Sequence, residues 1–430
     1  MTPRKYVPFL LGALLLAALL LIPFSKDANP ASIGKPDGKS NLQTVPGELI
    51  VDQLTNIHVN VSLTYIQFQQ LQELNRNFMM KYPHIQVKLV NEPSKRDAYT
   101  QWSLQSQRGE AADIMLLDNG WVRPFAVKGF LKPADSIMTG DTLTDQMAGL
   151  LEPLKWNGYL WGVPKDLNPY FVVWSSALLE EVGLKEPPLD WLGYQAAALK
   201  MIELHPEASI VNWGAGDLYQ QLVWLSAFRN NLSDGLQVLP VSENQMMQLG
   251  WFQERRANIS RIDGDETAAL TKAFETNKLL AAILTWNDYE KLPESVRGKL
   301  NVNREQIHYP WLNGRSYVLS SSSRMEDEAM LWIQEMSDIN NQQLVYDRSG
   351  QLPARASLYA FNSSLLREQA HIPPEWWTKV LNAKKADQQL PIPDPHWPEK
   401  WQQREQIWRT YSETTLEISA YLDALNELDQ

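Results

Sequence analysis

Polar and aromatic side chains come together directly after a short apolar segment, in the run Asp118-Asn119-Gly120-Trp121. A carboxylate and an amide form hydrogen bonds, an indole offers a flat apolar face, and glycine leaves the turn between them free. In open α/β sheets, ligands bind at the carboxyl ends of the strands. We therefore expect non-covalent binding of a small ligand here. In the alternative, Asp118 or Asn119 caps the next helix and Trp121 packs inward.

Catalytic chemistry has little support in the sequence. The chain has no cysteine, and its six histidines are dispersed without metal-ligand spacing. No HExxH, GxSxG or glycine-rich phosphate loop is present. We expect no enzyme activity, no cofactor and no metal site, although a glycosidase with two carboxylates from distant segments stays open.

The composition indicates a sizeable hydrophobic core and argues against nucleic acid as a partner. The 430 residues are 44% hydrophobic, which suffices for more than one domain. Acidic residues outnumber basic ones by 50 to 39, and the formal net charge is −11. A nucleic-acid-binding protein normally presents a basic face.

The elements that must position these side chains alternate from residue 49 onward. Apolar alternation and helical spacing predict strands at 49–61, 85–89 and 113–117, and helices at 65–82, 94–106 and 120–128. This βαβαβα order predicts a mostly parallel sheet with helices on its faces. Further helices are expected at 190–204, 216–229, 242–257, 266–277 and 323–339, with a buried strand at 279–284.

The N-terminus has the pattern of an export segment. Arg4 and Lys5 precede an 18-residue charge-free run, residues 7–24. This pattern fits either a cleaved signal peptide or a membrane anchor, and a buried core helix is the third alternative. The basic flank is expected to stay inside, which places the rest of the chain outside the membrane. Residues 25–46, rich in proline and glycine, are predicted to form a flexible linker.

Four stretches resemble one known family. They are FMMKYPHIQVKL at 78–89, GEAADIMLLDNGWVRPFAVKGFL at 109–131, WNGYLWGVPKDLNPYFVVW at 156–174, and the segment 329–355 that ends in GQLPAR. In this order they resemble extracellular solute-binding protein family 1, the sugar-binding proteins of ABC importers that include maltose-binding proteins. The lipid-attachment cysteine of many such receptors is absent, so the N-terminal segment becomes the candidate anchor.

The resemblance implies an α/β, two-lobed periplasmic-binding-protein-like fold (type II) with a hinge that the chain crosses three times. The crossings map near 153–158, 309–315 and 346–354. Lobe one is expected at 47–155 plus 314–348, and lobe two at 156–313 plus 349–430. The ligand is expected between the lobes, which close over it.

The resemblance also implies ligand-binding residues. These are Asp118, Asn119, Trp121, Asp166, Asn168, Tyr170, Trp213, Asp217, Trp286, Trp311, Arg315 and Trp397. Sugar sites combine aromatic faces with planar polar groups, and the 17 tryptophans supply many such faces. The alternatives are hinge hydrogen bonding for Asp166 and Asn168, an ordinary helix cap for Asp217, and core packing for the tryptophans.

The leading interpretation is the binding subunit of an importer at the outer face of the cell membrane. It would capture a small solute, most readily a sugar or oligosaccharide, and deliver it to ABC permease subunits. We expect a monomer that contacts the membrane only through its N-terminal segment. The alternatives are a membrane-tethered sensing module of the same fold with a signalling partner, and a soluble interaction domain without a small ligand.

Overall fold

The computed structural model of the 430-residue chain describes residues 54–428, apart from 139, 215–216, 229–242, 308–310, 312, 361–370, 383–395 and 414–416. The predicted signal peptide or anchor at 1–24 and the predicted linker at 25–46 lie outside the described residues. Within the described ranges, no helix is long and apolar enough to cross a membrane.

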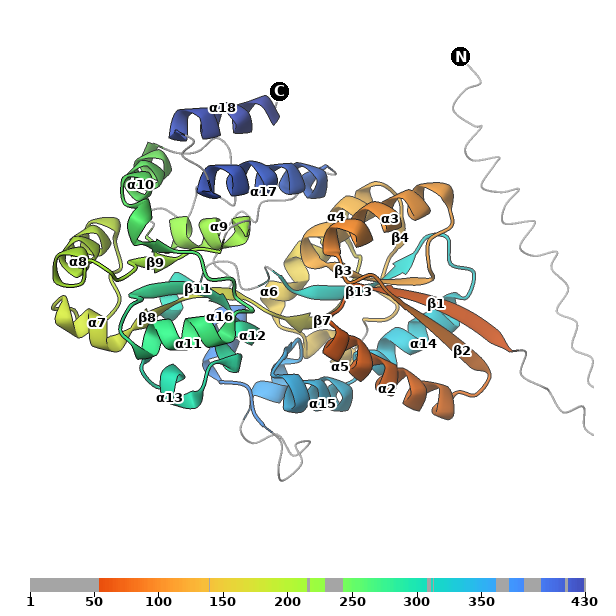
Figure 1. Cartoon of the computed structure of the whole chain (residues 1–430). Coiled ribbons are helices and arrows are strands. Elements are labelled where there is room, and N and C mark those ends of the chain that lie inside the picture. Colours follow the sequence, from red (N-terminus) through yellow and green to blue (C-terminus); the bar gives the residue numbers. More distant parts are fainter. Residues whose placement is uncertain are drawn as a thin grey trace, which may run out of the picture. The chain divides into compact units, whose positions relative to one another are not determined.

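A seven-stranded mixed sheet forms the first half of the fold (Figure 1). Its strands lie in the order β14-β7-β13-β3-β1-β2, and β4 pairs with β13. Their bounds are β1 (Thr55–Val61), β2 (Ile85–Asn91), β3 (Ile114–Asp118), β4 (Leu131–Lys132), β7 (Val163–Leu167), β13 (Arg315–Ser320) and β14 (Leu352–Pro353).

The prediction of a mostly parallel sheet is correct only for the first three strands. β1 pairs in parallel with β2 and β3, as a βαβαβ order requires. β13 lies antiparallel to β3, and β7 and β4 lie antiparallel to β13. The reason is topological, since β13 enters this sheet only after the chain has built a second sheet, and not through a βαβ crossover.

The second sheet has the strand order β10-β9-β11-β8-β12. Its strands are β8 (Tyr170–Ser175), β9 (Val211–Asn212), β10 (Ile259–Ser260), β11 (Ala281–Thr285) and β12 (Leu300–Val302). β8 runs antiparallel to β11 and β12, and β9 runs parallel to β10 and β11. β5 (Lys155–Trp156) and β6 (Tyr159–Leu160) form a separate hairpin.

Helices accompany both sheets (Figure 1). Those associated with the first are α2 (Tyr65–Lys81), α3 (Lys95–Arg108), α4 (Asn119–Val127), α5 (Gly140–Thr144), α6 (Ala148–Leu151), α14 (Glu326–Met336) and α15 (Ile339–Ser349). Those associated with the second are α7 (Ser176–Glu181), α8 (Trp191–Leu204), α9 (Leu218–Ala227), α10 (Glu243–Glu254), α11 (Thr267–Glu275), α12 (Trp286–Lys291) and α13 (Glu294–Arg297). The C-terminal helices are α16 (Trp376–Asn382), α17 (Trp397–Glu413) and α18 (Ile418–Leu428).

Local signals explain where the first helices begin and end. Ser94 caps α3, and its side chain accepts a hydrogen bond from the backbone nitrogen of Asp97. Gly109 ends the same helix in the left-handed conformation, with φ of 69°. Thr64 and Gln67 form a capping box at the start of α2. The helices predicted at 65–82, 94–106 and 120–128 are confirmed to within a few residues.

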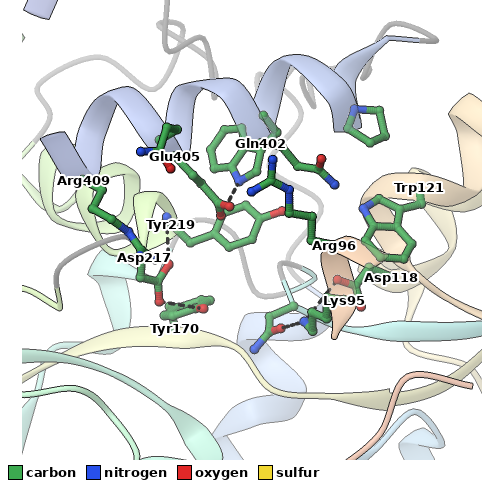
Figure 2. A pocket seen from close by; sticks show the side chains of 14 residues that line it. Lys95, Arg96, Asp118, Trp121, Tyr170, Asp217, Tyr219, Gln402, Glu405 and Arg409 are labelled. Carbon is green, nitrogen blue, oxygen red and sulfur yellow. Dashed lines mark hydrogen bonds and ion pairs between the residues drawn. The ribbon is translucent and has the colours of Figure 1, made fainter. Parts of the chain in front are cut away.

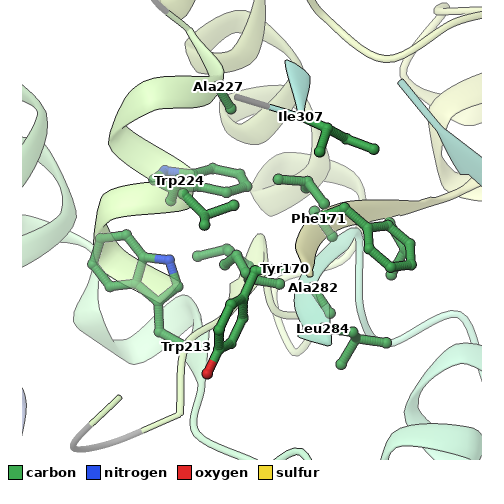
Figure 3. Close-up of a cluster of buried hydrophobic side chains, with 14 of the residues drawn as sticks. Tyr170, Phe171, Trp213, Trp224, Ala227, Ala282, Leu284 and Ile307 are labelled. Atoms are coloured by element: carbon green, nitrogen blue, oxygen red, sulfur yellow. The ribbon is translucent and has the colours of Figure 1, made fainter. Parts of the chain in front are cut away.

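Each sheet carries its own hydrophobic core. The first core joins strand residues such as Ile57 and Leu116 to Phe78 of α2 and Trp332 of α14. The second core is rich in aromatic rings, and Figure 3 shows Phe171, Trp213 and Trp224 within it. Each buried ring removes about 150–250 Å² from water. Two cores of this kind hold each half rigid by itself.

The chain passes between the two sheets in three places. It leaves the first sheet between β7 and β8, returns between β12 and β13, and leaves again after β14. β7 pairs with β13, so the first passage comes after Leu167, later than the predicted crossing at 153–158. The second passage, between β12 and β13, overlaps the predicted segment 309–315, whereas the third begins only after Pro353, at the end of the predicted segment 346–354.

Gly314 lies in the second passage, where the backbone approaches its neighbours closely. A Cβ atom there would stand 2.6 Å from Asn119 Nδ2 and 3.1 Å from the Trp311 carbonyl oxygen. We expect Gly314→Ala to lower the free energy of unfolding by about 1–3 kcal/mol, because the buried Asn119 side chain must give way. Chemical denaturation of the full chain measures this difference.

The matched control for Gly314→Ala is Gly250→Ala. Gly250 lies within α10, and nothing lies within 4 Å of a Cβ added there. Alanine in a helix interior stabilises by about 0.5–1 kcal/mol relative to glycine. Equal stabilities for the two variants would show that the close approach at Gly314 has no energetic consequence.

Candidate binding site

A cavity of about 400 Å³ is lined by residues from both halves of the fold and by one face of helix α17 (Figure 2). The first half of the fold contributes Lys95, Arg96, Asp118 and Trp121, and the second contributes Tyr170, Asp217 and Tyr219. Asn313, from the passage between the sheets, also lines it. The inner face of α17 supplies the remaining wall through Pro398, Trp401, Gln402, Glu405, Gln406 and Arg409.

Aromatic rings form the apolar part of the cavity wall. Trp401 stacks on Tyr219, with ring centroids 4.7 Å apart and an interplanar angle of 23°. Tyr170 lies against the same tyrosine at 5.9 Å. On the opposite side, Trp121 leans on Tyr99 of α3 at 5.1 Å. Flat faces therefore border the cavity from both halves of the fold.

Two carboxylates lie on the side of the second sheet. Asp217 accepts a hydrogen bond of 3.0 Å from the Tyr170 hydroxyl and one of 3.0 Å from the Tyr219 backbone nitrogen. Burial raises the pKa of Asp217, and these hydrogen bonds oppose the rise. Burial and the nearby Asp217 also raise the pKa of Glu405 to about 7, against a hydrogen bond from Trp401 Nε1. This side is therefore rich in acceptors and can take up a proton near neutral pH.

Basic side chains lie both on α3 and on α17 itself. Lys95 Nζ lies 3.1 Å from Asp118 Oδ2 and 2.9 Å from Asn313 Oδ1. Arg96 and Arg409 also line the cavity. Basic and acidic groups are balanced, so the site suits a polar solute better than a strongly charged one. Among the described residues, no group of three or more His, Asp or Glu side chains could hold a metal ion.

Four of the predicted site residues line this cavity, namely Asp118, Trp121, Tyr170 and Asp217. Asp118 ends β3 and stands at the N-cap of α4, but its side chain makes no capping hydrogen bond. Asp217 caps α9 through its side chain, as the alternative for that residue predicted, and it also lines the cavity. As ligand contacts, all four remain predictions.

Four other predicted residues form hydrogen bonds at or beside the passages between the sheets. Asp166 binds Arg315 through both carboxylate oxygens and also contacts Lys165. Asn119 accepts a 2.7 Å hydrogen bond from Ser316 and donates to the Trp311 carbonyl oxygen. Asn168 Oδ1 accepts a hydrogen bond from the backbone nitrogen of Asn287. The structure does not bring these side chains to the cavity wall.

The remaining predicted tryptophans are enclosed by protein. Trp213, Trp286 and Trp311 are only 6%, 2% and 5% exposed. Trp286 donates a hydrogen bond to the Gly350 carbonyl oxygen and packs edge-on against Trp377. Since their faces are covered, these rings are not available to stack on a ligand here. Trp397 is the first residue of α17, and its side chain lies outside the described part of the chain.

The cavity also contains residues that sequence reasoning missed. Lys95 and Arg96 begin α3 just beyond the carboxyl end of β2, so the rule applied to Asp118 could have found them. Trp401, Glu405 and Arg409 recur at helical spacing on α17. No local signal showed that this C-terminal helix turns its face toward segments hundreds of residues earlier.

The raised pKa of Glu405 gives a pH-dependent stability. Because its folded-state pKa of about 7 exceeds the ordinary value of 4.5, ionisation of Glu405 opposes folding at high pH. Glu405→Gln should raise the free energy of unfolding by about 1–2 kcal/mol at pH 8. The gain should shrink as the pH falls through 7 and vanish below about 4.5.

The control is Glu180→Gln, on an exposed face of α7. Chemical denaturation at pH 8 and at about pH 4.5 should show no such trend for this variant. A pH-independent difference for Glu405→Gln would contradict this electrostatic account.

Solved structures of sugar- and polyol-binding proteins share the fold. MalE3 of T. maritima with bound maltose is 15% identical, with a TM-score of 0.66 over 87% of this chain and 99% of that one. A solute-binding protein of Agrobacterium vitis S4 with bound D-mannitol is 16% identical, with a TM-score of 0.64 over 87% and 97%. The chain therefore has the α/β fold of the two-lobed MalE-like binding proteins.

Sequence comparison leads to the same group. A "Putative binding protein" of Brucella abortus (strain 2308) is 27% identical over 108 residues, which is a quarter of this chain and a quarter of that relative's length. The family model described as "Bacterial extracellular solute-binding protein" matches residues 64–343. That match covers more than half of the chain, which therefore belongs to the bacterial extracellular solute-binding protein family.

Proposed function

We propose that the chain captures a small polar solute, most readily a sugar or oligosaccharide, in the cavity beside α17 and delivers it to the permease of an ABC importer. The observation that carries the proposal is the lining of this cavity, which combines aromatic faces from both halves of the fold with a dense set of hydrogen-bonding groups.

The chemistry of the wall suits a carbohydrate. Sugar rings present apolar C–H faces, which pack on Trp121 and Tyr219, and hydroxyls that both donate and accept. Asp217 and Glu405 accept from hydroxyls, whereas Lys95 donates to them. A volume of about 400 Å³ falls within the ~300–1,000 Å³ usual for small-molecule sites.

Family membership supports the transport role. Proteins of this family are extracytoplasmic solute-binding proteins, and similar folds bind maltose or D-mannitol. In our proposal the loaded protein acts as a monomer, and the N-terminal segment keeps it at the outer face of the membrane.

Binding of a sugar should stabilise the folded chain by mass action. We expect maltose, D-mannitol, lacto-N-biose or a related sugar to raise the melting temperature of the full chain in a concentration-dependent manner. Trp121→Leu should raise the dissociation constant about 5- to 30-fold, because it removes one aromatic face. Calorimetric titration measures this loss.

The control for this experiment is Trp156→Leu. Trp156 is a partly buried tryptophan of β5, outside the cavity wall. Its replacement should leave the affinity unchanged. The absence of any stabilisation by a broad panel of sugars and polyols would contradict the proposed function, and equal losses in both variants would remove Trp121 from the site.

The export segment gives a separate prediction. If residues 1–24 anchor the protein, the mature chain keeps its N-terminus and fractionates with the membrane. Mass spectrometry of the mature N-terminus, together with membrane fractionation, measures both properties. Arg4→Glu with Lys5→Glu should reduce export, because the positive flank sets the orientation. A mature chain beginning after residue 24 would show that the segment is a cleaved signal and not an anchor.

A further inference from the structure

Helix α17 is attached firmly to the second half of the fold. Trp401 stacks on Tyr219 of α9, and Trp408 lies edge-on to Trp213 with centroids 5.5 Å apart. Trp401, Trp408 and Tyr411 are all buried members of the second core. Most of α17 must therefore move together with the second sheet.

The first turn of the same helix binds the first half of the fold instead. Glu399 Oε1 accepts a 2.7 Å hydrogen bond from the Tyr99 hydroxyl on α3. The same oxygen lies 3.0 Å from the ammonium group of Lys128, which follows α4. Lys128 also lies 3.4 Å from the Tyr99 hydroxyl, so the three groups form one closed cluster.

This cluster is in contact with the cavity wall. The ring of Tyr99 packs against Trp121, which lines the cavity, and against Phe125 of α4. Pro398, the residue before Glu399, also lines the cavity. Any movement that separates α17 from α3 and α4 therefore opens the wall around a bound solute.

The two attachments of α17 differ in strength. The attachment to the second core buries several aromatic rings, whereas the hydrogen bonds that join α17 to Tyr99 and Lys128 all involve one carboxylate whose side chain is 42% exposed. Burial tends to raise the pKa of Glu399, but the hydrogen bonds from Tyr99 and Lys128 outweigh it and lower that pKa, so the group is ionised. Its second oxygen, Oε2, is buried and has no hydrogen-bond partner among the described residues. The polar attachment is the one that yields first.

We propose that Glu399, Tyr99 and Lys128 form a latch that holds α17 against the first half of the fold and so keeps the cavity closed. The latch regulates the site of the proposed function and rests on it. When the latch separates, water replaces the partners of Glu399 and Lys128, and the opening is readily reversed. Its strength sets the balance between open and closed forms before any solute binds.

The natural absence of cysteine permits a direct test without solute. Spin labels on Asn77→Cys of α2 and Glu203→Cys of α8, both exposed, report the distance between the two halves in the full chain. Glu399→Gln and, separately, Tyr99→Phe should shift the distance distribution to longer values. The ratio of open to closed forms should rise roughly 3- to 10-fold in Glu399→Gln, as expected for a partly exposed charged hydrogen bond.

Glu335→Gln is the matched control. It breaks the 2.8 Å ion pair between Glu335 and Lys81, which joins α14 to α2 within the first half. We expect its distance distribution to equal that of the labelled parent. Coincident distributions for Glu399→Gln and the parent, or equal shifts in Glu399→Gln and Glu335→Gln, would overturn the latch. Because the readout needs no sugar, failure of the proposed function in the titrations is distinguishable from failure of the latch.

Discussion

The buried pair of Arg315 and Asp166 is the interaction on which the arrangement of the two halves depends. It joins β13 to β7, the strands through which the chain enters and leaves the first sheet. Burial would raise the pKa of Asp166, but Arg315 and Lys165 outweigh it and hold that pKa far below its usual value. Removal of either partner would leave an uncompensated buried charge, so the geometry of the strand pair is strongly constrained.

The constrained pair of β7 and β13 also holds in place the residues that join the two halves beside the cavity. Gly314 allows the backbone beside Arg315 to approach Asn119, which is itself held by Ser316. Asn313 then reaches both the Asn168 carbonyl oxygen and Lys95 of the cavity wall. The polar residues at this junction contribute by holding the cavity-lining residues at fixed separations.

The interior of each half differs in chemical composition from the surfaces that line the cavity. Inside each half, apolar packing is extensive, and opening it would expose large areas to water. Between them lie aromatic faces together with carboxylates and basic groups, and water can also satisfy the hydrogen bonds of the carboxylates and basic groups. This distribution places the apolar burial inside each half and the groups that suit a polar solute between the halves. It also explains why Glu405, close to Asp217 and partly buried, titrates near neutral pH.

The sequence by itself determined the α/β class, the approximate bounds of the first helices, and the family. Those properties follow from periodicity, helix caps and ordered motifs, which are local. The family resemblance, taken from the sequence, also named Asp118, Trp121, Tyr170 and Asp217 as ligand contacts, and these four line the cavity. Only the tertiary structure decided that the sheets are mixed, that Trp213 and Trp286 are core residues, and that α17 forms a cavity wall. The physical reason is that strand direction, burial and helix docking depend on contacts between residues far apart in the chain, and local patterns do not record them.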